Sequence, residues 1–313
     1  MKIFLAGATG VMGRHLIPAL VGAGHEVVGT TRSAGKSDGI RAAGAESVVL
    51  DALDRDAVLR AVAQAGPDVV IHQLTAIGKS DFKRFDDAFT GTNELRTQGL
   101  DYLLEAAQRA GAKRFIAQSF TGWPNPHSGS AVKTEDDPLD PKPAANSVQS
   151  LAAIRHVEST LRAATGIDGL ALRYAFFYGP GTSFDRGAEI YEAVAKRRMP
   201  IVGGGTGVFS FIHIRDAARA TAIAVERGDP GVYNIVDDDP APVSTWLPYY
   251  AEIIGAKRPL RAPAWLVRPM LGEFGVAMMT TMRGSSNAKA KAELGWTPSY
   301  PSWRDGFSEL RTT

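Results

Sequence analysis

The sequence predicts an α/β protein, in which a doubly wound parallel sheet is joined to a smaller C-terminal substrate-binding lobe. Over the first half of the chain, short β-branched runs alternate with helical stretches, the pattern of a parallel sheet covered by helices on both faces. A glycine-rich turn joins the first run to the first helical stretch. The chain has 313 residues, more than one compact core usually serves, so a main domain and a smaller lobe are expected.

The strands of the main domain are expected at short apolar runs bounded by turn residues. In chain order they are Lys2–Ala6, Glu26–Thr30, Ser47–Leu50, Val69–Gln73, Arg114–Gln118 and Gly169–Arg173. The regular alternation lapses after Arg173, so the chain is expected to cross into the smaller lobe there. A late run, Gly231–Val236, is expected to return to the main sheet.

Helices are expected between these strands, where apolar residues recur at three- and four-residue spacing. They are Arg14–Ala23, Arg55–Ala65, Glu94–Ala110 and Ser150–Thr165. Each is followed by a glycine that can end it in a left-handed conformation, namely Gly24, Gly66, Gly111 and Gly166. The proline-rich segment 123–146 is expected to be a long loop over the carboxyl ends of the strands, where it can line a cleft.

The composition excludes several kinds of site and partner. The chain has no cysteine, which excludes disulfides, thiolate metal sites and a cysteine nucleophile, and fits a cytoplasmic protein. Its basic residues are scattered, the densest run being Lys196-Arg197-Arg198, so no nucleic-acid partner is expected. No stretch approaches about 18 uninterrupted apolar residues, so no membrane span is expected. Neither His72 nor His213 has metal-ligand spacing, so no metal site is expected.

The turn Gly7-Ala8-Thr9-Gly10-Val11-Met12-Gly13 is typical of a loop that binds a dinucleotide. It follows an apolar strand and precedes an amphipathic helix, so backbone amides and the positive helix end can hold a pyrophosphate. Glycine is needed because a β-carbon would block the phosphates or the packing of helix on strand. Residues 1–174 with 206–237 are therefore predicted to form a Rossmann domain, and 175–205 and 238–313 the substrate-binding lobe. The expected cofactor contacts here are Gly7, Thr9, Gly10, Val11, Met12 and Gly13.

The end of the second strand favours NADP(H) over NAD(H). An NAD-binding domain usually has an acid there that hydrogen-bonds the adenosine ribose. This chain has Thr31 and Arg32 at that place, with Lys36 close behind. The cations suit a 2′-phosphate by charge and by forked hydrogen bonding, so these three residues are expected to lie around it. The alternative is a solvated basic turn.

Further motifs resemble the extended short-chain dehydrogenase/reductase family, also known as the NAD-dependent epimerase/dehydratase family. They include His72-Gln73-Leu74-Thr75-Ala76, Tyr178-Gly179-Pro180-Gly181, Phe211-Ile212-His213-Ile214-Arg215-Asp216 and Glu293-Leu294-Gly295-Trp296. The resemblance runs nearly end to end and implies a Rossmann fold that binds a nicotinamide cofactor and a small-molecule substrate. The further cofactor contacts that it implies are Asp51, Ala52, Leu74, Thr75, Ala76, Asn93 and Gln118.

The proton-transferring pair of that family is missing from this sequence. Family members have a Tyr-x-x-x-Lys pair on the helix after the fifth strand, and the lysine lowers the pKa of the tyrosine. Aligning that helix by Glu158 puts Ser150 in the tyrosine place and Ile154 in the lysine place. No Tyr-x-x-x-Lys occurs anywhere in the chain. The resemblance is therefore to an atypical member with a non-standard proton donor.

Other groups are candidates for the chemistry. Tyr174 and Tyr178 are the first candidates for proton donor, because the strand end that bears them is expected to face the nicotinamide. The alternative for Tyr174 is an aromatic wall of the pocket. The resemblance implies that Ser119 holds the substrate oxygen, a role that Thr121, two residues later, can share. The remaining candidates are Lys133 and His156.

The leading hypothesis is an NADP(H)-dependent oxidoreductase that reduces a carbonyl or a conjugated double bond of a small, fairly apolar metabolite. Aromatic residues of the smaller lobe, such as Phe176, Trp246 and Phe274, suggest the apolar substrate. The alternatives are an isomerase, lyase or cyclase without net redox, and a non-enzymatic redox sensor that binds NADP(H) and a partner protein. Because relatives often dimerise, the resemblance also implies a homodimer.

Overall fold

The main sheet of the computed structural model has seven strands, all parallel, in the order β12-β7-β5-β4-β1-β2-β3. The structure describes residues 1–78 and 81–311. The strands are β1 (Lys2–Ala6), β2 (Glu26–Thr31), β3 (Glu46–Val49), β4 (Val69–His72), β5 (Arg114–Phe120), β7 (Asp168–Tyr174) and β12 (Gly231–Ile235). The winding reverses at β1, which pairs with β2 on one side and β4 on the other. This topology confirms the predicted doubly wound Rossmann sheet.

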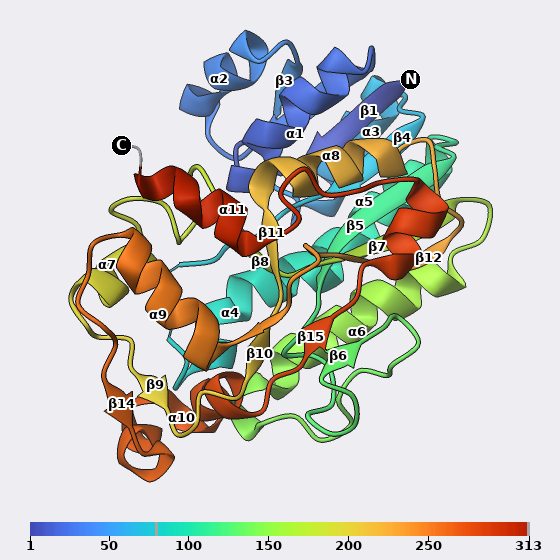
Figure 1. The fold of residues 1–313 in the computed structure, drawn as a ribbon. Coiled ribbons are helices and arrows are strands. Elements are labelled where there is room, and N and C mark those ends of the chain that lie inside the picture. Colours follow the sequence, from blue (N-terminus) through green and yellow to red (C-terminus); the bar gives the residue numbers. More distant parts are fainter. Residues whose placement is uncertain (79–80, 312–313) are drawn as a thin grey trace.

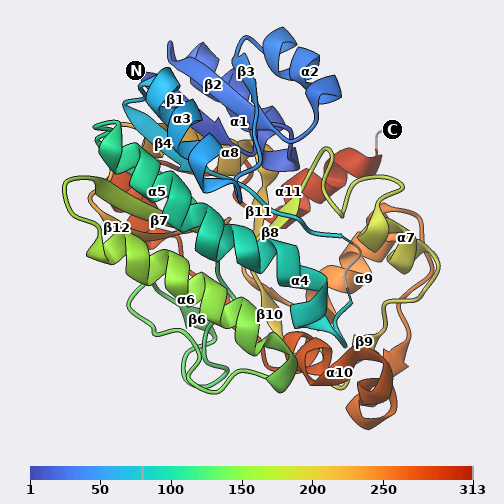
Figure 2. The same cartoon turned by 180° about the vertical axis from the view of Figure 1, so that it is seen from behind.

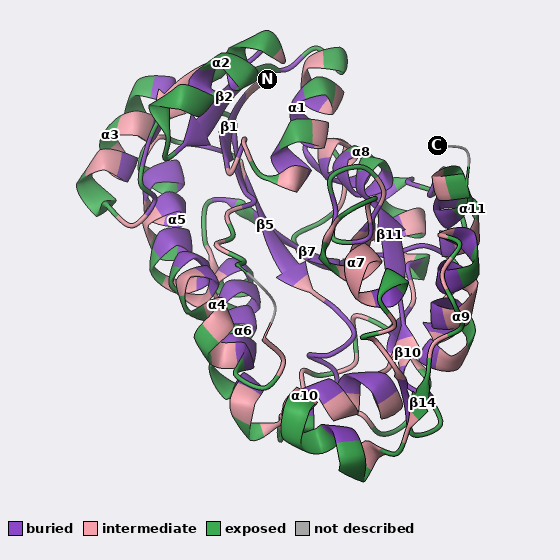
Figure 3. Ribbon diagram, turned by 90° about the vertical axis from the view of Figure 1, so that its left-hand side faces the viewer, coloured by how far each residue is buried: buried purple, intermediate pink, exposed green. Residues whose placement is uncertain are grey.

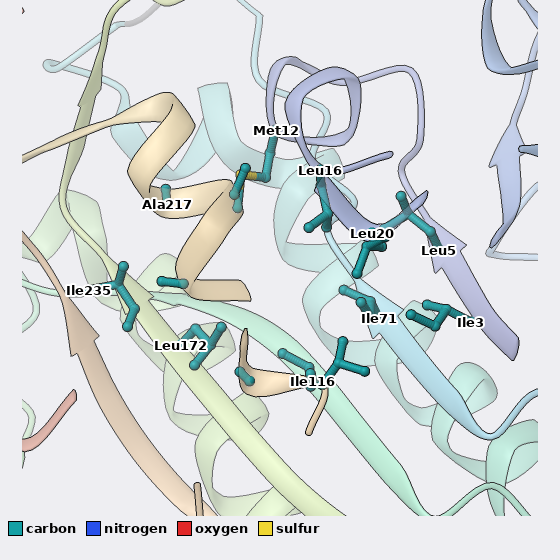
Figure 4. Close-up of a cluster of buried hydrophobic side chains, with 14 of the residues drawn as sticks. Ile3, Leu5, Met12, Leu16, Leu20, Ile71, Ile116, Leu172, Ala217 and Ile235 are labelled. Atoms are coloured by element: carbon teal, nitrogen blue, oxygen red, sulfur yellow. The ribbon is translucent and has the colours of Figure 1, made fainter. Parts of the chain in front are cut away.

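Helices cover both faces of the sheet, and each face has its own apolar core (Figures 1 and 2). On one face lie α1 (Val11–Gly22) and α8 (Ile214–Ala224), which pack their apolar sides on the strands around Leu16, Ile71 and Ile116 (Figure 4). On the other lie α3 (Arg55–Ala65), α5 (Leu100–Arg109) and α6 (Val148–Ala163). Strands buried on both faces explain why the sequence shows continuous apolar runs rather than alternation.

The late strand β12 returns to the main sheet, as expected, and pairs in parallel with β7 from Gly231 opposite Leu170 to Ile235 opposite Tyr174. The polypeptide between the two strands first enters the smaller lobe. It then comes back as β11 (Phe211–His213) and α8, which packs beside α1. The main sheet and the smaller lobe are thus built from interleaved parts of the chain.

One helical region is longer than expected. The sequence predicts a helix over Glu94–Ala110, but helical structure begins at Phe85 with α4 (Phe85–Glu94) and continues through a π-helical turn, Leu95–Gly99, into α5. Polar and flexible residues in α4 interrupt its apolar spacing, so packing decides its conformation: Phe85 stacks on Phe89 with ring centroids 4.4 Å apart. The helix α2 (Ser37–Ala42) is too short for a periodic pattern.

The smaller lobe packs short elements around an aromatic core. Its helices are α7 (Glu189–Ala195), α9 (Val243–Ile253), α10 (Ala264–Thr280) and α11 (Trp303–Ser308). Two-residue and three-residue strands tie it together in pairs: β8 (Phe176–Tyr178) with β11, β9 (Ile201–Val202) with β14 (Arg261–Ala262), and β10 (Val208–Phe209) with β13 (Ala241–Pro242). The predicted loop 123–146 contains only β6 (Val132–Lys133), paired with β15 (Gly284–Ser285), and one 3-10 turn, Ala145–Ser147, at its end.

Candidate active site

The predicted cofactor residues come together at the carboxyl ends of the parallel strands. Five loops meet there because β1 to β5 all run in the same direction, and the winding reverses beside β1. In Figure 3 the buried strands β5 and β7 run toward the region between α4 and α7. A doubly wound sheet binds its ligand at this place, outside the strand ends at the reversal point.

The loop from Gly7 to Gly13, called here the phosphate loop, is shaped by backbone contacts that only glycine permits. Gly7 has φ +100°, and a β-carbon on it would lie 2.7 Å from the Gln73 carbonyl oxygen. A β-carbon on Gly13 would clash with the carbonyl oxygens of Gly7 and Ala8, the latter at 2.5 Å. The loop therefore holds α1 directly against β1, in the arrangement that lets amides approach a pyrophosphate.

The start of α1 has no side-chain cap, and Gly10 before it is exposed. Gly10 is the N-cap residue and has no side chain that could bond the first helical amides. The first turn of α1 has no acidic residue. Val11 lies beside Gly181, and the Pro180 carbonyl lies 3.2 Å from His15 Nε2, so the Tyr178–Gly181 segment borders the loop. Thr9 is half-buried and Met12 is in the core. Free amides at a helix N-terminus fit the pyrophosphate of the implied cofactor.

Two cations follow β2 without partners. Arg32 and Lys36 are exposed, and neither side chain forms an ion pair or hydrogen bond with the part of the chain that the structure describes. Thr31 is buried instead, and its hydroxyl accepts the Ser33 N–H at 3.2 Å and so shapes the turn. Arg32 and Lys36 thus remain available to an anion at the edge of the site.

Hydrogen bonds fix the loop after β4 to β5 on one side and to α4 on the other. Gln118 Nε2 donates to the Leu74 carbonyl at 2.7 Å, and the Ala76 N–H donates to Thr92 Oγ1 at 3.0 Å. Asp51 is exposed and accepts the Leu53 N–H at 3.1 Å. The other two predicted contacts in these loops are Ala52, which is buried, and Thr75, which is exposed.

The place of the missing tyrosine and lysine is filled by a polar contact and a core side chain. Ser150 is fully buried; its hydroxyl donates to Asp86 Oδ1 at 2.7 Å and accepts from Asn93 Nδ2 at 3.2 Å. Ile154 is also fully buried, in the aromatic core. We call Ser150, Ile154, Asp86 and Asn93 the α6 site. The Asn93 amide oxygen is buried and has no hydrogen-bond partner among the described residues, and the predicted contact of Asn93 with the cofactor stays a prediction.

The Ser119 hydroxyl is hydrogen-bonded to a buried ion pair. Its hydroxyl donates to Glu158 Oε1 at 2.7 Å, and Glu158 accepts two further bonds from Arg173, at 2.6 and 2.7 Å. All three side chains are at least 94% buried. This geometry gives Ser119 a structural bond in place of the expected contact with a substrate oxygen.

The other predicted catalytic hydroxyls also point into the interior. Thr121 Oγ1 lies 2.6 Å from Ser285 Oγ, and the Tyr174 hydroxyl lies 2.7 Å from Thr221 Oγ1 and accepts from Gln73. Tyr174 and Tyr178 are at most 1% exposed. Burial raises the pKa of both phenols well above the usual value, so neither is suited to give up a proton near neutral pH.

The two remaining candidates lie in other surroundings. Lys133 is buried on the long loop and pairs with Asp137 at 3.0 Å. His156 lies 2.7 Å from Asp101 on the outer side of α6, facing α5. The sequence reasoning missed Asp86, whose carboxylate also accepts the Gln149 and Ser150 amides at the start of α6. No sequence spacing links it to Ser150, because α4 and α6 meet only in the fold.

The comparisons with known proteins agree with this fold. The model of the NAD dependent epimerase/dehydratase family matches residues 3–236. This chain belongs to that family. A 3-diazoavenalumate denitrifying reductase from a Streptomyces species is 44% identical, with 98% of this chain and 99% of the relative covered. A crystal structure of a human epimerase family protein with NADPH has a TM-score of 0.77 at 18% identity over the full length of both chains, and so shares the fold.

A third relative is more distant. The 4-hydroxy-2-methyl-3-oxo-4-farnesyl-3,4-dihydroquinoline-1-oxide ketoreductase of Stigmatella aurantiaca is 27% identical, with 82% of this chain and 74% of the relative covered. Family and relatives together make the chain an oxidoreductase that uses a nicotinamide cofactor. No helix within residues 1–78 and 81–311 is long and apolar enough to cross a membrane. The homodimer stays a prediction.

Proposed function

We propose that this protein is an NADP(H)-dependent reductase that replaces the diazonium group of a small aromatic substrate with hydrogen. The observation that carries the proposal is the α6 site, where a serine bonded to Asp86 and a buried isoleucine stand in place of the tyrosine and lysine. A reaction that needs no proton from the protein suits such a site. The relative at 44% identity is named for the denitrifying reduction of a diazo compound.

The proposed reaction balances without an acid or a base. NADPH, when bound, supplies a hydride to the ring carbon that carries the diazonium group. The new C–H bond uses the electron pair of the hydride, and the electron pair of the breaking C–N bond leaves with dinitrogen. The substrate loses neutral dinitrogen and gains one hydride, and its positive charge is balanced by the charge that the nicotinamide acquires on oxidation, so no proton is taken up or released. Carbonyl reduction differs because it leaves an alkoxide that an acid has to protonate.

The α6 site is bordered by a cluster of buried aromatic rings and carries one carboxylate. Phe85 stands next to Asp86, and its ring packs on Phe274 at 4.0 Å and on Trp123 at 5.2 Å. Aromatic faces attract cations, and they also stack on an aromatic ring. The Asp86 carboxylate adds negative charge at the start of α6. The protein thus offers orientation and electrostatic attraction to the substrate rather than proton transfer.

The preference for NADP(H) rests on Arg32 and Lys36. Because neither has a partner in the described part of the chain, a 2′-phosphate would gain their charge without breaking an existing ion pair. We expect Arg32→Ala to raise the Kd of NADPH about tenfold and to leave the Kd of NADH unchanged. The matched control is Arg41→Ala, since Arg41 pairs with Asp38 at 2.7 Å. Equal loss of affinity for both cofactors would contradict the assignment.

Isotope labelling tests the proposed reaction directly. The purified protein is mixed with a benzenediazonium salt and NADPH deuterated at C4, and then, separately, with unlabelled NADPH in D₂O. We expect one dinitrogen per oxidised NADPH, deuterium on the ring in the first experiment and none in the second. Protein-free samples correct for spontaneous decomposition of the salt. NADPH left unoxidised, or deuterium on the ring from the solvent, would rule out the proposal.

The carbonyl or conjugated double bond expected from the sequence is the second candidate, and the relative named a ketoreductase favours it. It requires a proton, which the Ser150 hydroxyl bonded to Asp86 would have to deliver. Reduction of a double bond in D₂O would place deuterium from the solvent on carbon. In carbonyl reduction, kcat would change with pH as the proton-donating group ionises. The two candidates therefore differ in isotope incorporation and in the pH dependence of kcat.

A further inference from the structure

The smaller lobe contains an apolar pocket of about 160 Å³ that lies outside the α6 site. α7 and the segment 198–200 form one wall, α10 forms another, and Phe82 from the main domain closes a third side. Its apolar lining includes Phe82, Ile190, Ala193, Met199, Leu271 and Met278. A cavity of roughly 150 Å³ with such a lining accepts a benzene-sized group. The pocket is therefore large enough for the apolar arm of a small substrate.

A chain of packed rings connects this pocket with the α6 site. Phe82 lines the pocket, and its ring lies 6.4 Å from Phe274; Phe274 in turn packs on Phe85 at 4.0 Å. Phe85 is followed directly by Asp86 of the α6 site. The backbone at the same junction is tight, because Asn146 Nδ2 donates to the Phe82 carbonyl at 2.9 Å. The pocket thus lies at the other end of the aromatic cluster that borders the reaction site.

One cation stands on the rim of the pocket without a partner. Arg198 lines it, is exposed, and its guanidinium has no ion pair or hydrogen bond with any residue that the structure describes. Its two neighbours are engaged elsewhere: Lys196 pairs with Glu192, and Arg197 donates to the Arg258 carbonyl at 3.1 Å. Glu189, the acidic lining residue, is engaged within the protein. An apolar pocket with a free guanidinium at its rim suits an apolar group that ends in a carboxylate.

We propose that this pocket takes the apolar arm of an aromatic carboxylic acid, and that Arg198 pairs with its carboxylate. The reacting ring of the same molecule then lies beside the α6 site. The inference rests on the proposed function for the nature of the reacting group, whereas the pocket and its cation are read from the structure. Arg198 is accordingly a specificity-determining residue that acts at the far end of the substrate.

The first experiment measures binding by calorimetry, with cinnamate and its methyl ester as probes and NADP⁺ present. We expect the wild-type protein to prefer the acid, and Arg198→Gln to weaken cinnamate about tenfold without changing the affinity for the ester. The control is Lys196→Gln. Lys196 belongs to the same basic run but does not line the pocket, so this variant should bind both probes as the wild type does. Equal affinity of wild type for acid and ester, or an Arg198→Gln protein that keeps its preference, would overturn the proposal.

A second pair of variants tests the volume of the pocket. Ala193→Phe fills it from α7, so we expect both probes to bind at least about tenfold more weakly, since neither can insert its arm. Ala195 lies on the same helix but is exposed and does not line the pocket, so Ala195→Phe is the matched control and should bind as wild type. Wild-type binding of both probes by Ala193→Phe would show that the arm lies elsewhere.

Kinetics separate this inference from the proposed reaction. With the diazonium salt made from 3-aminocinnamic acid, Arg198→Gln should raise KM about tenfold and leave kcat unchanged. If cinnamate binding depends on Arg198 while no diazonium salt is reduced, the pocket assignment stands and the proposed reaction fails. If Arg198→Gln reduces the acid and its ester with wild-type KM values, the reaction stands and the pocket assignment fails.

Discussion

The phosphate loop and the α6 site lie at the same edge of the sheet, yet they differ in what they require of the sequence. The phosphate loop works through backbone amides, so glycine at Gly7 and Gly13 is almost its whole requirement. The α6 site of the wider family needs two particular side chains, and here both positions are buried and joined to structural neighbours. Cofactor binding can therefore persist while the proton chemistry beside it changes.

The largest effect is expected at the ion pair that supports α6 from within. Glu158→Gln leaves the Arg173 guanidinium, only 3% exposed, without its charged partner. It also replaces one of the two oxygens that accept bonds from Ser119 and Arg173 with an NH2 group, which cannot accept. We expect the free energy of unfolding to fall by about 3–5 kcal/mol, measured by urea denaturation. The control is Ser159→Ala, on the exposed side of the same helix. A loss below about 1 kcal/mol would mean that Glu158 is kept for a reason other than stability.

A second test concerns the phosphate loop. Gly13→Ala would place a β-carbon against the Gly7 and Ala8 carbonyl oxygens, so the loop or the helix has to move. We expect NADPH affinity to fall more than about 100-fold by calorimetry, because displaced amides no longer converge on the phosphates. The control is Gly22→Ala in the same helix, where the added carbon meets nothing within 4 Å. Full NADPH affinity in Gly13→Ala would remove the basis for the cofactor site.

A third test measures how far the pH dependence of stability comes from His213, which lies in β11. Burial lowers the pKa of this imidazole to about 4, and its Nδ1 accepts the Arg215 N–H at 3.2 Å at the start of α8. The unfolded chain titrates near the usual value of about 6.5 and binds the proton first. The neutral ring thus contributes stability that is complete above pH 6.5 and is lost as pH falls toward 4. Between pH 7 and pH 4, we expect the free energy of unfolding of His213→Asn to fall by about 2 kcal/mol less than that of the wild type, as measured by urea unfolding. The same pH dependence of the free energy of unfolding in both proteins would contradict this.

The smallest effect is expected at the α6 site itself. Ser150→Ala removes the hydroxyl bonded to Asp86, but the proposed reaction takes no proton from it. We expect kcat with a benzenediazonium salt to change by less than about threefold, and its pH profile to stay as in the wild type. A fall of about 100-fold or more would make Ser150 the proton source and would favour carbonyl reduction.

The sequence was sufficient for the fold and the phosphate loop because both follow from local rules. Apolar runs such as Lys2–Ala6 and the glycine spacing after them predict a strand, a turn and a helix without knowledge of distant contacts. Ser119 shows the limit of this reasoning. It lies at the carboxyl end of β5, one residue past the end that the sequence predicted, but the direction of its hydroxyl is set by Glu158, which only the packing of α6 on the sheet brings within 2.7 Å.

The same limit applies to the tyrosines and to the pocket. Tyr174 lies at the predicted strand end, but its hydroxyl is hydrogen-bonded in the interior to Thr221 of α8 and to Gln73, which follows β4. Arg198 was visible in the sequence only as part of a basic run. Its position on the rim of an apolar pocket depends on α10, a helix that lies far along the chain.

The position of β12 has a consequence for how the molecule can be made or divided. Its neighbour β7 ends at Tyr174, but β12 begins only at Gly231, after the chain has passed through the smaller lobe. A nascent chain on the ribosome therefore cannot complete its sheet until that passage has been synthesised. A truncation after Tyr174 would leave the backbone edge of a fully buried strand open to other chains, and such a fragment should aggregate rather than survive as a separate cofactor-binding unit.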